Sequence, residues 1–521
     1  MGNFCHSPQG AAMHSITIEN FRCFGEKQTA RLAPLTLLVG ENSTGKTSFL
    51  ALLRALDDFF HDDIPDFKRP PYDLGSFDEV AHYPGGKRGR PETFSAEIAA
   101  LFDKDSWHGC QNWVSEAYRQ GKWKLAVQFG KDTKGTAPVP VCLRISLDGM
   151  NKEENTWIAF DYESPSVKVG TKRGIWDISS YFPFQNKPMP FSERNMMTSL
   201  FVYDLPILSR RPEEFLDIVN IFKPENDSSN IIESDMQDLC SLNIAMCTMV
   251  KIFRMEHVDR FSRFFASAPI RSQPRRTYDP ASSVSDPEGH SVPMLLAELS
   301  LHQPEVWAKL KQHLENFGCS SGLFDEIRIR HLGRFPSDPF QVQVRKSGQT
   351  KRKGPWRNLI DVGYGVSQAL PIITELLHDK VEQPWDDAEQ ERPESLYCYY
   401  PRQFLLQQPE VHLHPSAQAA LGSVFCQVAS PLRQLIVETH SDHLMDRVRM
   451  DVRDGVSGLK PEDVSILFFE RRDLDVRIHS LRLDEQGNVL GAPDGYRQFF
   501  MDEMTRSLWP ERSSERSKVE T

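Results

Sequence analysis

The chain has 521 residues, of which 39% are hydrophobic, 26% charged and 10% aromatic. That balance excludes a disordered or fibrous chain, and it leaves room for roughly three domain-sized units or for one large domain with a long insertion. The formal net charge of −11 excludes a generally basic surface, so a nucleic-acid contact would require a local basic patch.

The sequence contains neither a membrane-targeting pattern nor a paired-cysteine motif. No apolar run approaches the roughly 18–20 residues that cross a bilayer, and the N-terminus lacks a basic-then-apolar signal. The nine cysteines are scattered and never form a Cys-x-x-Cys pair, which argues for reduced thiols rather than a zinc site or a disulfide framework. We therefore expect a cytoplasmic protein with no membrane partner, in which residues 1–12 are a tag or an alternative start.

The first elements in chain order are two strands and a helix. Apolar residues recur within residues 14–25, and residues 35–39 form a short apolar run. Over residues 46–60 the apolar side chains return every three or four positions, as in a buried helix. After a polar and glycine-rich stretch, alternating segments at residues 93–101 and 123–129 predict antiparallel strands.

Residues 101–334 differ in composition from the sequence on either side, and we interpret them as an insertion of mixed α+β structure. A helix is predicted from Ile232 to Phe253, and it indicates a short helical arm because no heptad is sustained. The insertion would divide one domain into a first part at residues 13–100 and a second part at residues 335–510. Residues 511–521 are charged and serine-rich, and we expect them to be disordered.

Regular elements resume near the end of the proposed insertion. A hairpin is predicted at residues 327–330 and 340–344, followed by a helix from about Gln368. Residues 404–406 and 435–437 are short and wholly apolar, as in the buried strands of a parallel sheet. Together these elements predict an α/β fold.

The most specific motif lies between the second predicted strand and the first predicted helix. From Gly40 to Thr47 it reads Gly-Glu-Asn-Ser-Thr-Gly-Lys-Thr, a complete phosphate loop. Its glycines let backbone N–H groups point at phosphate oxygens, and the following helix directs its positive end to the same place. We expect Lys46 to reach the β- and γ-phosphates of ATP and the Thr47 hydroxyl to bind Mg²⁺. The predicted nucleotide contacts are Gly40, Glu41, Asn42, Ser43, Thr44, Gly45, Lys46, Thr47 and Ser48.

Three further clusters place polar residues at the ends of predicted elements. Residues 361–368 combine small residues with a serine ahead of an apolar helix, which is either an anion-binding helix start or a plain N-cap. Residues 404–415 and 435–441 are apolar strands followed by polar residues, the usual place for ligand chemistry in an open α/β sheet. A single histidine is more often structural, but the joint order of these motifs is specific.

In this order the motifs resemble those of ABC-type ATPases of the SMC-like and OLD-like branch, over residues 13–90 and 335–500. The resemblance implies an ABC-type P-loop nucleotide-binding domain that is split by an insertion and binds ATP and Mg²⁺. The residues that match the family's other functional positions are Arg22 on the N-terminal strand, Gly365, Ser367 and Gln368 in the signature motif, Gln407 and Gln408 at the Walker B pair, and the switch histidine His440.

Three other segments are similar to the stand-alone ATPases of anti-phage defence operons, such as the Septu and PARIS ATPase subunits. They are residues 75–80, 269–276 and 465–470. This resemblance implies a sensor or scaffold subunit that controls a separate effector, such as a nuclease. Two alternatives stay open, namely a DNA-repair or recombination ATPase that acts directly on DNA and a non-hydrolysing, nucleotide-gated scaffold.

The Walker B pair departs from the family's pattern. The family has an acidic residue that holds the Mg²⁺ shell and then a glutamate or glutamine at the general-base position, but this chain has Gln407 and Gln408. An amide cannot take a proton from water, and a general base contributes about 10²- to 10⁴-fold to a rate. We therefore expect slow or absent hydrolysis, as a natural property or through an introduced Glu→Gln change at Gln407. Glu410 either compensates in part or is a loop carboxylate without a metal contact.

The resemblance assigns roles to these positions in a dimer. Gln407, Gln408 and His440 would meet the reacting phosphate, and Thr47 and Gln407 would face the metal. Two subunits would enclose two ATP molecules, with the phosphate loop of one facing Ser367 of the other, so that nucleotide favours the closed dimer.

A cleaving activity is not expected within this chain. About 80 residues follow His440, too few for a TOPRIM nuclease of the OLD type. Asp473 and Asp475 are expected in a surface hairpin rather than in a metal site. Short basic runs are the candidates for a nucleic-acid surface formed on dimerisation, although solvated loops are the commoner explanation. The runs are Lys87, Arg88 and Arg90; Lys168, Lys172 and Arg173; Arg275 and Arg276; and Lys351, Arg352 and Lys353.

Overall fold

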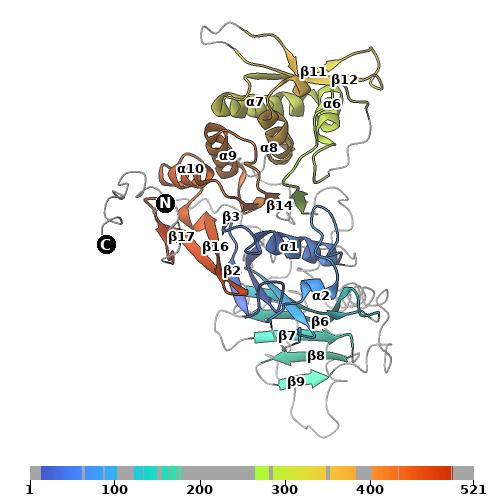
Figure 1. The fold of residues 1–521 in the computed structure, drawn as a ribbon, viewed down its shortest axis with the longest axis vertical. Coiled ribbons are helices and arrows are strands. Elements are labelled where there is room, and N and C mark those ends of the chain that lie inside the picture. Colours follow the sequence, from blue (N-terminus) through green and yellow to red (C-terminus); the bar gives the residue numbers. More distant parts are fainter. Residues whose placement is uncertain are drawn as a thin grey trace, which may run out of the picture.

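The computed structural model has an α/β fold built from two large sheets and a small one (Figure 1). The residues that the structure describes are 13–60, 65–85, 89–101, 122–132, 134–148, 155–163, 166–171, 174–177, 264–280, 286–347, 353–382, 402–431, 433–493 and 496. The helix predicted from Ile232 to Phe253 and the segments 1–12 and 511–521 lie outside the described residues. The interpretation of residues 101–334 as one insertion therefore stays a prediction.

The central sheet carries the phosphate loop and has seven strands in the order β10-β14-β15-β3-β16-β17-β18. The first five strands are parallel and the last two are antiparallel. Their bounds are β10 (Phe265–Ser267), β14 (Arg402–Gln407), β15 (Arg433–Glu438), β3 (Leu35–Gly40), β16 (Val464–Arg472), β17 (Asp475–Leu483) and β18 (Val489–Leu490). The two buried parallel strands expected near residues 404–406 and 435–437 are confirmed as β14 and β15.

The second large sheet is antiparallel and has eight strands in the order β2-β1-β4-β5-β6-β7-β8-β9. Their bounds are β1 (Met13–Glu19), β2 (Gln28–Arg31), β4 (Phe94–Leu101), β5 (Lys122–Lys131), β6 (Pro138–Asp148), β7 (Asn155–Asp161), β8 (Ser166–Thr171) and β9 (Gly174–Asp177). The antiparallel pair predicted at residues 93–101 and 123–129 is confirmed. Because β5 to β9 continue the pairing that starts at β4, residues 122–177 extend the sheet formed by the first part of the chain.

The helices and the small sheet complete the fold. The helices are α1 (Lys46–Phe60), α2 (Phe77–Val80), α6 (Val292–His302), α7 (Pro304–Ser321), α8 (Tyr364–Glu382), α9 (Pro415–Val428) and α10 (Asp442–Arg453), with 3₁₀ turns at Leu359–Asp361 and Pro461–Asp463. The predicted hairpin is confirmed as β11 (Glu326–His331) and β12 (Phe340–Arg345), which β13 (Arg357–Asn358) joins. Helix α8 begins at Tyr364, ahead of the expected Gln368, because Val366 is already packed in the core. Within the described ranges, no helix is both long and apolar enough to span a bilayer.

Two hydrophobic cores cover the two faces of the central sheet, which explains why its strands are almost wholly apolar. On one face, Leu405 and Ile436 share a core with α1 and with the antiparallel sheet. On the other face, Leu406 and Val437 share a core with helices α6 to α10 (Figure 1). Burial of apolar surface contributes about 25 cal/mol per Å². This burial holds the apolar residues of each strand inside the two cores. The polar residues that follow them therefore lie at the edge of the sheet.

A buried ionic cluster ties the start of two central strands to α8. The carboxylate of Asp379 accepts hydrogen bonds from Arg402 at 2.6 Å and from Arg433 at 2.7 Å. Asp379 is completely buried and Arg433 is only 2% exposed. Because removing one partner from such a cluster leaves a buried charge uncompensated, it is a sensitive point for stability.

Candidate nucleotide-binding site

The phosphate loop connects β3 to α1, and two glycines allow its tight path. Gly40 has φ 141° and Gly45 has φ 83°, values that side-chain-bearing residues rarely adopt. A Cβ at Gly45 would lie 2.4 Å from the sulfur of Cys23, and one at Gly40 would lie 2.6 Å from the carbonyl oxygen of Phe469. Both glycines therefore serve close backbone packing as well as loop conformation. The loop lies at the end of β3, where the sequence placed it.

Lys46 is folded back over this loop. Its Nζ donates to the carbonyl oxygen of Gly40 at 3.0 Å and to that of Glu41 at 2.5 Å. Burial lowers the pKa of Lys46, while the charges of Glu438 and Glu41 raise it. The two carbonyls hold the ammonium group in place but do not neutralise it. The arrangement suits an anion arriving at the start of α1, where free N–H groups already favour negative charge.

A cavity of about 300 Å³ opens in front of the loop. Its lining consists of Arg22, Cys23, Ser43, Thr44, Gly45, Lys46, Thr47, Ser48 and Glu438. The Arg22 guanidinium donates to the carbonyl oxygen of Leu74 at 2.8 Å, which holds it at the mouth of the cavity. The structure thus brings Arg22 together with the phosphate loop. Gly40, Glu41 and Asn42 belong to the same loop but do not line the cavity.

Side chains from three elements meet beside this cavity, and two of them, Thr47 and Glu438, line it. The Thr47 hydroxyl donates to Oε2 of Glu438 at 2.9 Å. The side-chain amide of Gln407 donates to the same hydroxyl at 3.1 Å. Glu438 is 3% exposed, and burial raises its pKa, opposed by the hydrogen bond from Thr47 and by the charge of Lys46. We call this group, Thr47, Gln407 and Glu438, the acidic corner.

Glu438 is the residue of the acidic corner that the sequence analysis missed. It is the last residue of β15 and is paired in register with Gln407, the last residue of β14. Its position at the end of a buried parallel strand, two residues ahead of His440, was a usable signal. The family pattern places the metal-holding carboxylate at the position of Gln407, on a different strand, and so gives no indication of Glu438.

Gln408 contributes its backbone to the site. It has φ 42°, and its N–H donates to the carbonyl oxygen of Glu438 at 2.9 Å. Arg271 donates to the carbonyl oxygens of Gln407 and Gln408, each at 3.3 Å, and thereby fixes the turn after β14. Burial lowers the pKa of Arg271 to about 10, opposed by the charge of Glu410. The sequence analysis singled out Arg271 only as part of a resemblance; the structure gives it this positioning role.

His440 and Glu410 lie beside each other after β15 and β14. The backbone N–H of His440 donates to Oε1 of Glu410 at 2.7 Å. Burial raises the pKa of Glu410, whereas burial and the charge of Lys46 lower the pKa of His440. The His440 side chain is exposed, so it is available to a ligand. Glu410 holds the backbone that carries His440.

The signature residues do not line the cavity within one chain. Ser367 is buried, and its hydroxyl donates to the carbonyl oxygen of Tyr364 at 2.8 Å. Gln368 is completely buried, and its amide exchanges hydrogen bonds with the backbone N–H and carbonyl of Arg271. Gln368 therefore positions Arg271, and through it the turn after β14. A contact of Gly365, Ser367 or Gln368 with the nucleotide of a second subunit stays a prediction.

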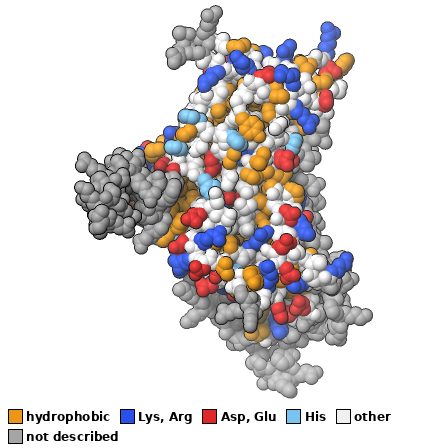
Figure 2. Space-filling model, viewed as in Figure 1, with side chains coloured by type: hydrophobic (Ala, Val, Ile, Leu, Met, Phe, Trp, Pro, Cys, Tyr) orange, Lys and Arg blue, Asp and Glu red, His pale blue; other side chains and the backbone are white. Residues whose placement is uncertain are grey.

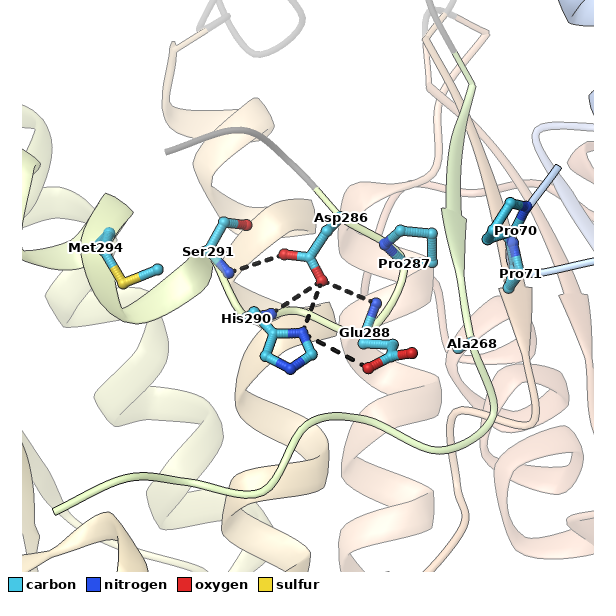
Figure 3. A pocket seen from close by; sticks show the side chains of 9 residues that line it. All are labelled: Pro70, Pro71, Ala268, Asp286, Pro287, Glu288, His290, Ser291 and Met294. Atoms are coloured by element: carbon cyan, nitrogen blue, oxygen red, sulfur yellow. Dashed lines mark hydrogen bonds and ion pairs between the residues drawn. The ribbon is translucent and has the colours of Figure 1, made fainter. Parts of the chain in front are cut away.

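A larger pocket, of about 610 Å³, lies beside the start of α6 (Figure 3). Its polar groups are already paired with one another. The Asp286 carboxylate accepts from the backbone N–H groups of Glu288, His290 and Ser291 and pairs with the His290 ring. Size alone therefore does not identify the functional site. The smaller cavity combines a phosphate loop with the Lys46 ammonium group and a buried carboxylate.

The basic runs are only partly described, and several described members are engaged. Arg276 makes two hydrogen bonds with Asp361, and Lys353 pairs with Glu326. Arg90 donates to the carbonyl oxygen of Ala81. Lys87, Arg88, Lys172, Arg173, Lys351 and Arg352 lie outside the described residues. On the face shown in Figure 2, acidic and basic side chains lie side by side over the antiparallel sheet.

Comparison with known proteins adds independent information. No curated protein matches the chain significantly. A family model described as an AAA ATPase domain matches residues 13–240, and one described as an AAA domain of the AbiEii toxin, Type IV TA system, matches residues 250–446. Each of these matches covers less than half of the chain. They agree with the sequence analysis at the level of an ATPase.

Solved structures with some likeness include SMC head domains. The Smc head domain of Pyrococcus furiosus, bound to the C-terminal domain of ScpA, has 11% identity and a TM-score of 0.38, covering 90% of this chain and 96% of its own. The SMC head domain from Thermotoga maritima has 9% identity and a TM-score of 0.36, covering 90% of this chain and 98% of its own. These superpositions are loose. The assignment as an α/β fold of the ABC-type P-loop class depends on the strand order and on the loop itself.

The residues present fit a magnesium nucleotide. Magnesium prefers oxygen ligands, and it commonly takes one carboxylate, a hydroxyl and phosphate oxygens while it keeps several waters. The acidic corner supplies a carboxylate in Glu438 and a hydroxyl in Thr47. The loop supplies N–H groups and the Lys46 ammonium for the phosphates. Among the described residues no three His, Cys, Asp or Glu side chains cluster as a metal site.

Proposed function

We propose that this chain is an ATPase subunit that binds ATP with Mg²⁺ at its phosphate loop and dimerises when it does so. The observation that carries the proposal is the acidic corner in front of the loop, where Thr47 meets Glu438 at 2.9 Å. The Thr47 hydroxyl would face the metal, which supplies charge neutralisation for the phosphates. Lys46 and the loop N–H groups would bind the β- and γ-phosphates.

Turnover by this site is expected to be slow. Neither Gln407 nor Gln408 can act as a general base, and the amide of Gln407 is engaged by Thr47. Glu410 accepts from the backbone N–H of His440 through Oε1, so it also positions His440. These observations favour a subunit that uses nucleotide as a switch over one that hydrolyses it rapidly.

A second subunit would complete the site. The N-terminal turn of α8 is exposed at Gly363 and Tyr364, although Ser367 itself is buried. In the proposed dimer this turn offers N–H groups to the γ-phosphate held by the partner's phosphate loop. Ser367 would join them only by turning its hydroxyl away from Tyr364.

The proposed biological role is that of a sensor or scaffold subunit in an anti-phage defence complex that controls a separate effector such as a nuclease. The segments similar to defence ATPases support it, and one of them contains Arg271, which braces the Walker B turn. A non-hydrolysing scaffold is the alternative that the two glutamines favour. The described basic residues give a directly DNA-acting ATPase little support, since Arg276 and Lys353 are paired with carboxylates.

Sedimentation velocity with and without Mg-ATP tests the dimer. The parent should shift from monomer to dimer on addition of Mg-ATP, and Lys46→Ala should stay monomeric. Gly363→Arg is the matched variant, because a Cβ at Gly363 meets no atom within 4 Å and the single chain tolerates it. It should bind ATP as the parent does and fail to dimerise. Dimerisation that ignores nucleotide and both substitutions would refute the proposal.

The defence role needs a separate experiment. Purification of the chain together with the products of its neighbouring genes, followed by mass analysis, should show a co-eluting effector protein whose association depends on Mg-ATP. Co-elution of DNA alone, lost steeply as salt is raised, would instead support the DNA-repair alternative.

A further inference from the structure

The carboxylate normally expected at the end of the Walker B strand is absent, but a carboxylate is present one strand away. Phosphate-loop ATPases hold Mg²⁺ through the loop Ser or Thr and an acidic residue that ends the Walker B strand. Here that strand, β14, ends in Gln407, while the adjacent strand β15 ends in Glu438. We propose that Glu438 has taken over the metal-holding role that Gln407 cannot perform. The inference rests on the proposed function, since it concerns the magnesium that accompanies the nucleotide.

Strand register places the two side chains at the same height on the sheet edge. Gln407 is paired directly with Glu438, and Glu438 is paired with Leu38, two residues before Gly40. Strand β15 lies between β14 and β3. A carboxylate at the end of β15 is therefore one strand closer to the phosphate loop than a carboxylate at the end of β14 would be.

The contacts show that Glu438 reaches the same atom that Gln407 reaches. The Thr47 hydroxyl oxygen accepts from the Gln407 amide at 3.1 Å and gives its proton to Glu438 at 2.9 Å. A hydroxyl has one proton and two acceptor positions, so one acceptor position stays available on Thr47. That oxygen and the Glu438 carboxylate together form the pair that a magnesium ion requires from the protein.

The burial of the Glu438 carboxylate and the charges around it favour a bound cation. This residue is 3% exposed, and the charge of Lys46 acts on it while the Lys46 ammonium group itself donates to the carbonyl oxygens of Gly40 and Glu41. The hydrogen bond to Glu438 comes from a neutral hydroxyl. A buried carboxylate whose direct contact is a neutral group is costly, and a divalent cation at this position would offset that cost. The Gln407 amide, by contrast, adds no charge.

The experiment measures metal binding rather than turnover. Mn²⁺ replaces Mg²⁺, and the loss of the free Mn²⁺ signal in electron paramagnetic resonance reports its binding to the full chain in the presence of ADP. Glu438→Gln should weaken Mn²⁺ binding by about 10- to 100-fold, the range seen when groups that support a metal site are removed. Glu470→Gln neutralises a carboxylate on strand β16, which is separated from β15 by β3, and it should leave Mn²⁺ affinity unchanged because Glu470 does not line the cavity.

A double variant that exchanges the two side chains, called the transposed variant, is the reciprocal test. Gln407→Glu combined with Glu438→Gln returns the carboxylate to the Walker B position and should recover most of the lost Mn²⁺ affinity. Glu438→Asp keeps the charge but shortens the side chain, and it should bind Mn²⁺ with intermediate affinity. ATP affinity in EDTA serves as the folding control, and it should stay within about threefold of the parent in every variant, since the phosphate loop is intact.

The outcomes separate this inference from the function on which it rests. If the parent binds no ATP with or without metal, the proposed function fails. If the parent binds ATP and Mn²⁺ but Glu438→Gln binds Mn²⁺ equally well, the proposed function stands and the relocation of the carboxylate is wrong. A transposed variant that binds Mn²⁺ no better than Glu438→Gln would also count against it.

Discussion

Gln407→Glu tests the geometry of the acidic corner most sharply in the absence of any ligand. The substitution is nearly isosteric and adds one negative charge on the far side of the Thr47 hydroxyl from Glu438. Because both side chains contact that one hydroxyl, at 3.1 and 2.9 Å, the new carboxylate oxygen would lie no more than about 6 Å from Glu438. Two unit charges at this separation repel by about 3 kcal/mol at an effective dielectric constant of 20.

Gln407→Glu should lower the free energy of unfolding without metal and should not lower it with metal. In EDTA the free energy of unfolding, measured by urea denaturation at pH 8, should fall by up to about 3 kcal/mol. Part of this loss is avoided because one of the paired carboxylates takes up a proton more readily. With Mg²⁺ and ADP present, the second carboxylate becomes an additional ligand, and the variant should be at least as stable as the parent.

Gln408→Glu is the matched control for this prediction. It adds the same charge one residue further on, but Gln408 meets Glu438 through its backbone N–H rather than through its side chain. Its unfolding in EDTA should change by less than about 1 kcal/mol, as for a charge without a close partner. Equal losses in the two variants, or no loss in Gln407→Glu, would refute the reasoning about the acidic corner.

Three further changes probe the loop and the fold. Gly45→Ala should lower ATP affinity at least 10-fold in titration calorimetry, because its Cβ would lie 2.4 Å from the Cys23 sulfur at φ 83°; unchanged affinity would contradict the loop geometry. Asp379→Ala should cost about 3–5 kcal/mol in urea denaturation, because it removes the carboxylate that the buried Arg433 shares with the half-buried Arg402, whereas a cost below about 1 kcal/mol would refute that role. Asp286→Ala should cost about 2 kcal/mol at pH 7 by removing backbone hydrogen bonds to a carboxylate. Burial raises the pKa of Asp286, but those bonds outweigh it and hold the pKa below the usual 3.8. The stabilisation by Asp286 is therefore complete above pH 3.8 and is lost as the pH falls through the lowered pKa. If Asp286→Ala still lowered the free energy of unfolding well below that pKa, the assignment would be contradicted.

The elements that the sequence predicted best are those whose pattern is local. The helix over residues 46–60 follows from the spacing of its apolar residues, and the buried strands β14 and β15 follow from apolar runs. The phosphate loop follows from a complete sequence motif. The start of α8 was placed too late because its first turn contains Gly365, which gives no apolar signal, although Val366 is already in the core. Local periodicity reports burial, and it is weakest at the ends of elements.

The acidic corner could not be read from the sequence because it depends on strand order. Glu438 and Gln407 are 31 residues apart, and Thr47 is 391 residues from Glu438. Only the placement of β15 between β14 and β3 brings the three side chains together. Likewise, Gln368 matched a family motif, but its complete burial against Arg271 is a tertiary fact.

The account as a whole depends on a nucleotide bound at the phosphate loop. Isothermal titration of Mg-ATP into the full chain is the most direct measurement, with Lys46→Ala as the comparison. We predict saturable binding of one ATP per chain to the parent and a loss of at least 100-fold in affinity for Lys46→Ala, because the ammonium group over Gly40 and Glu41 is the fixed positive charge of the loop. Equal binding by both proteins, or none by the parent, would contradict the account.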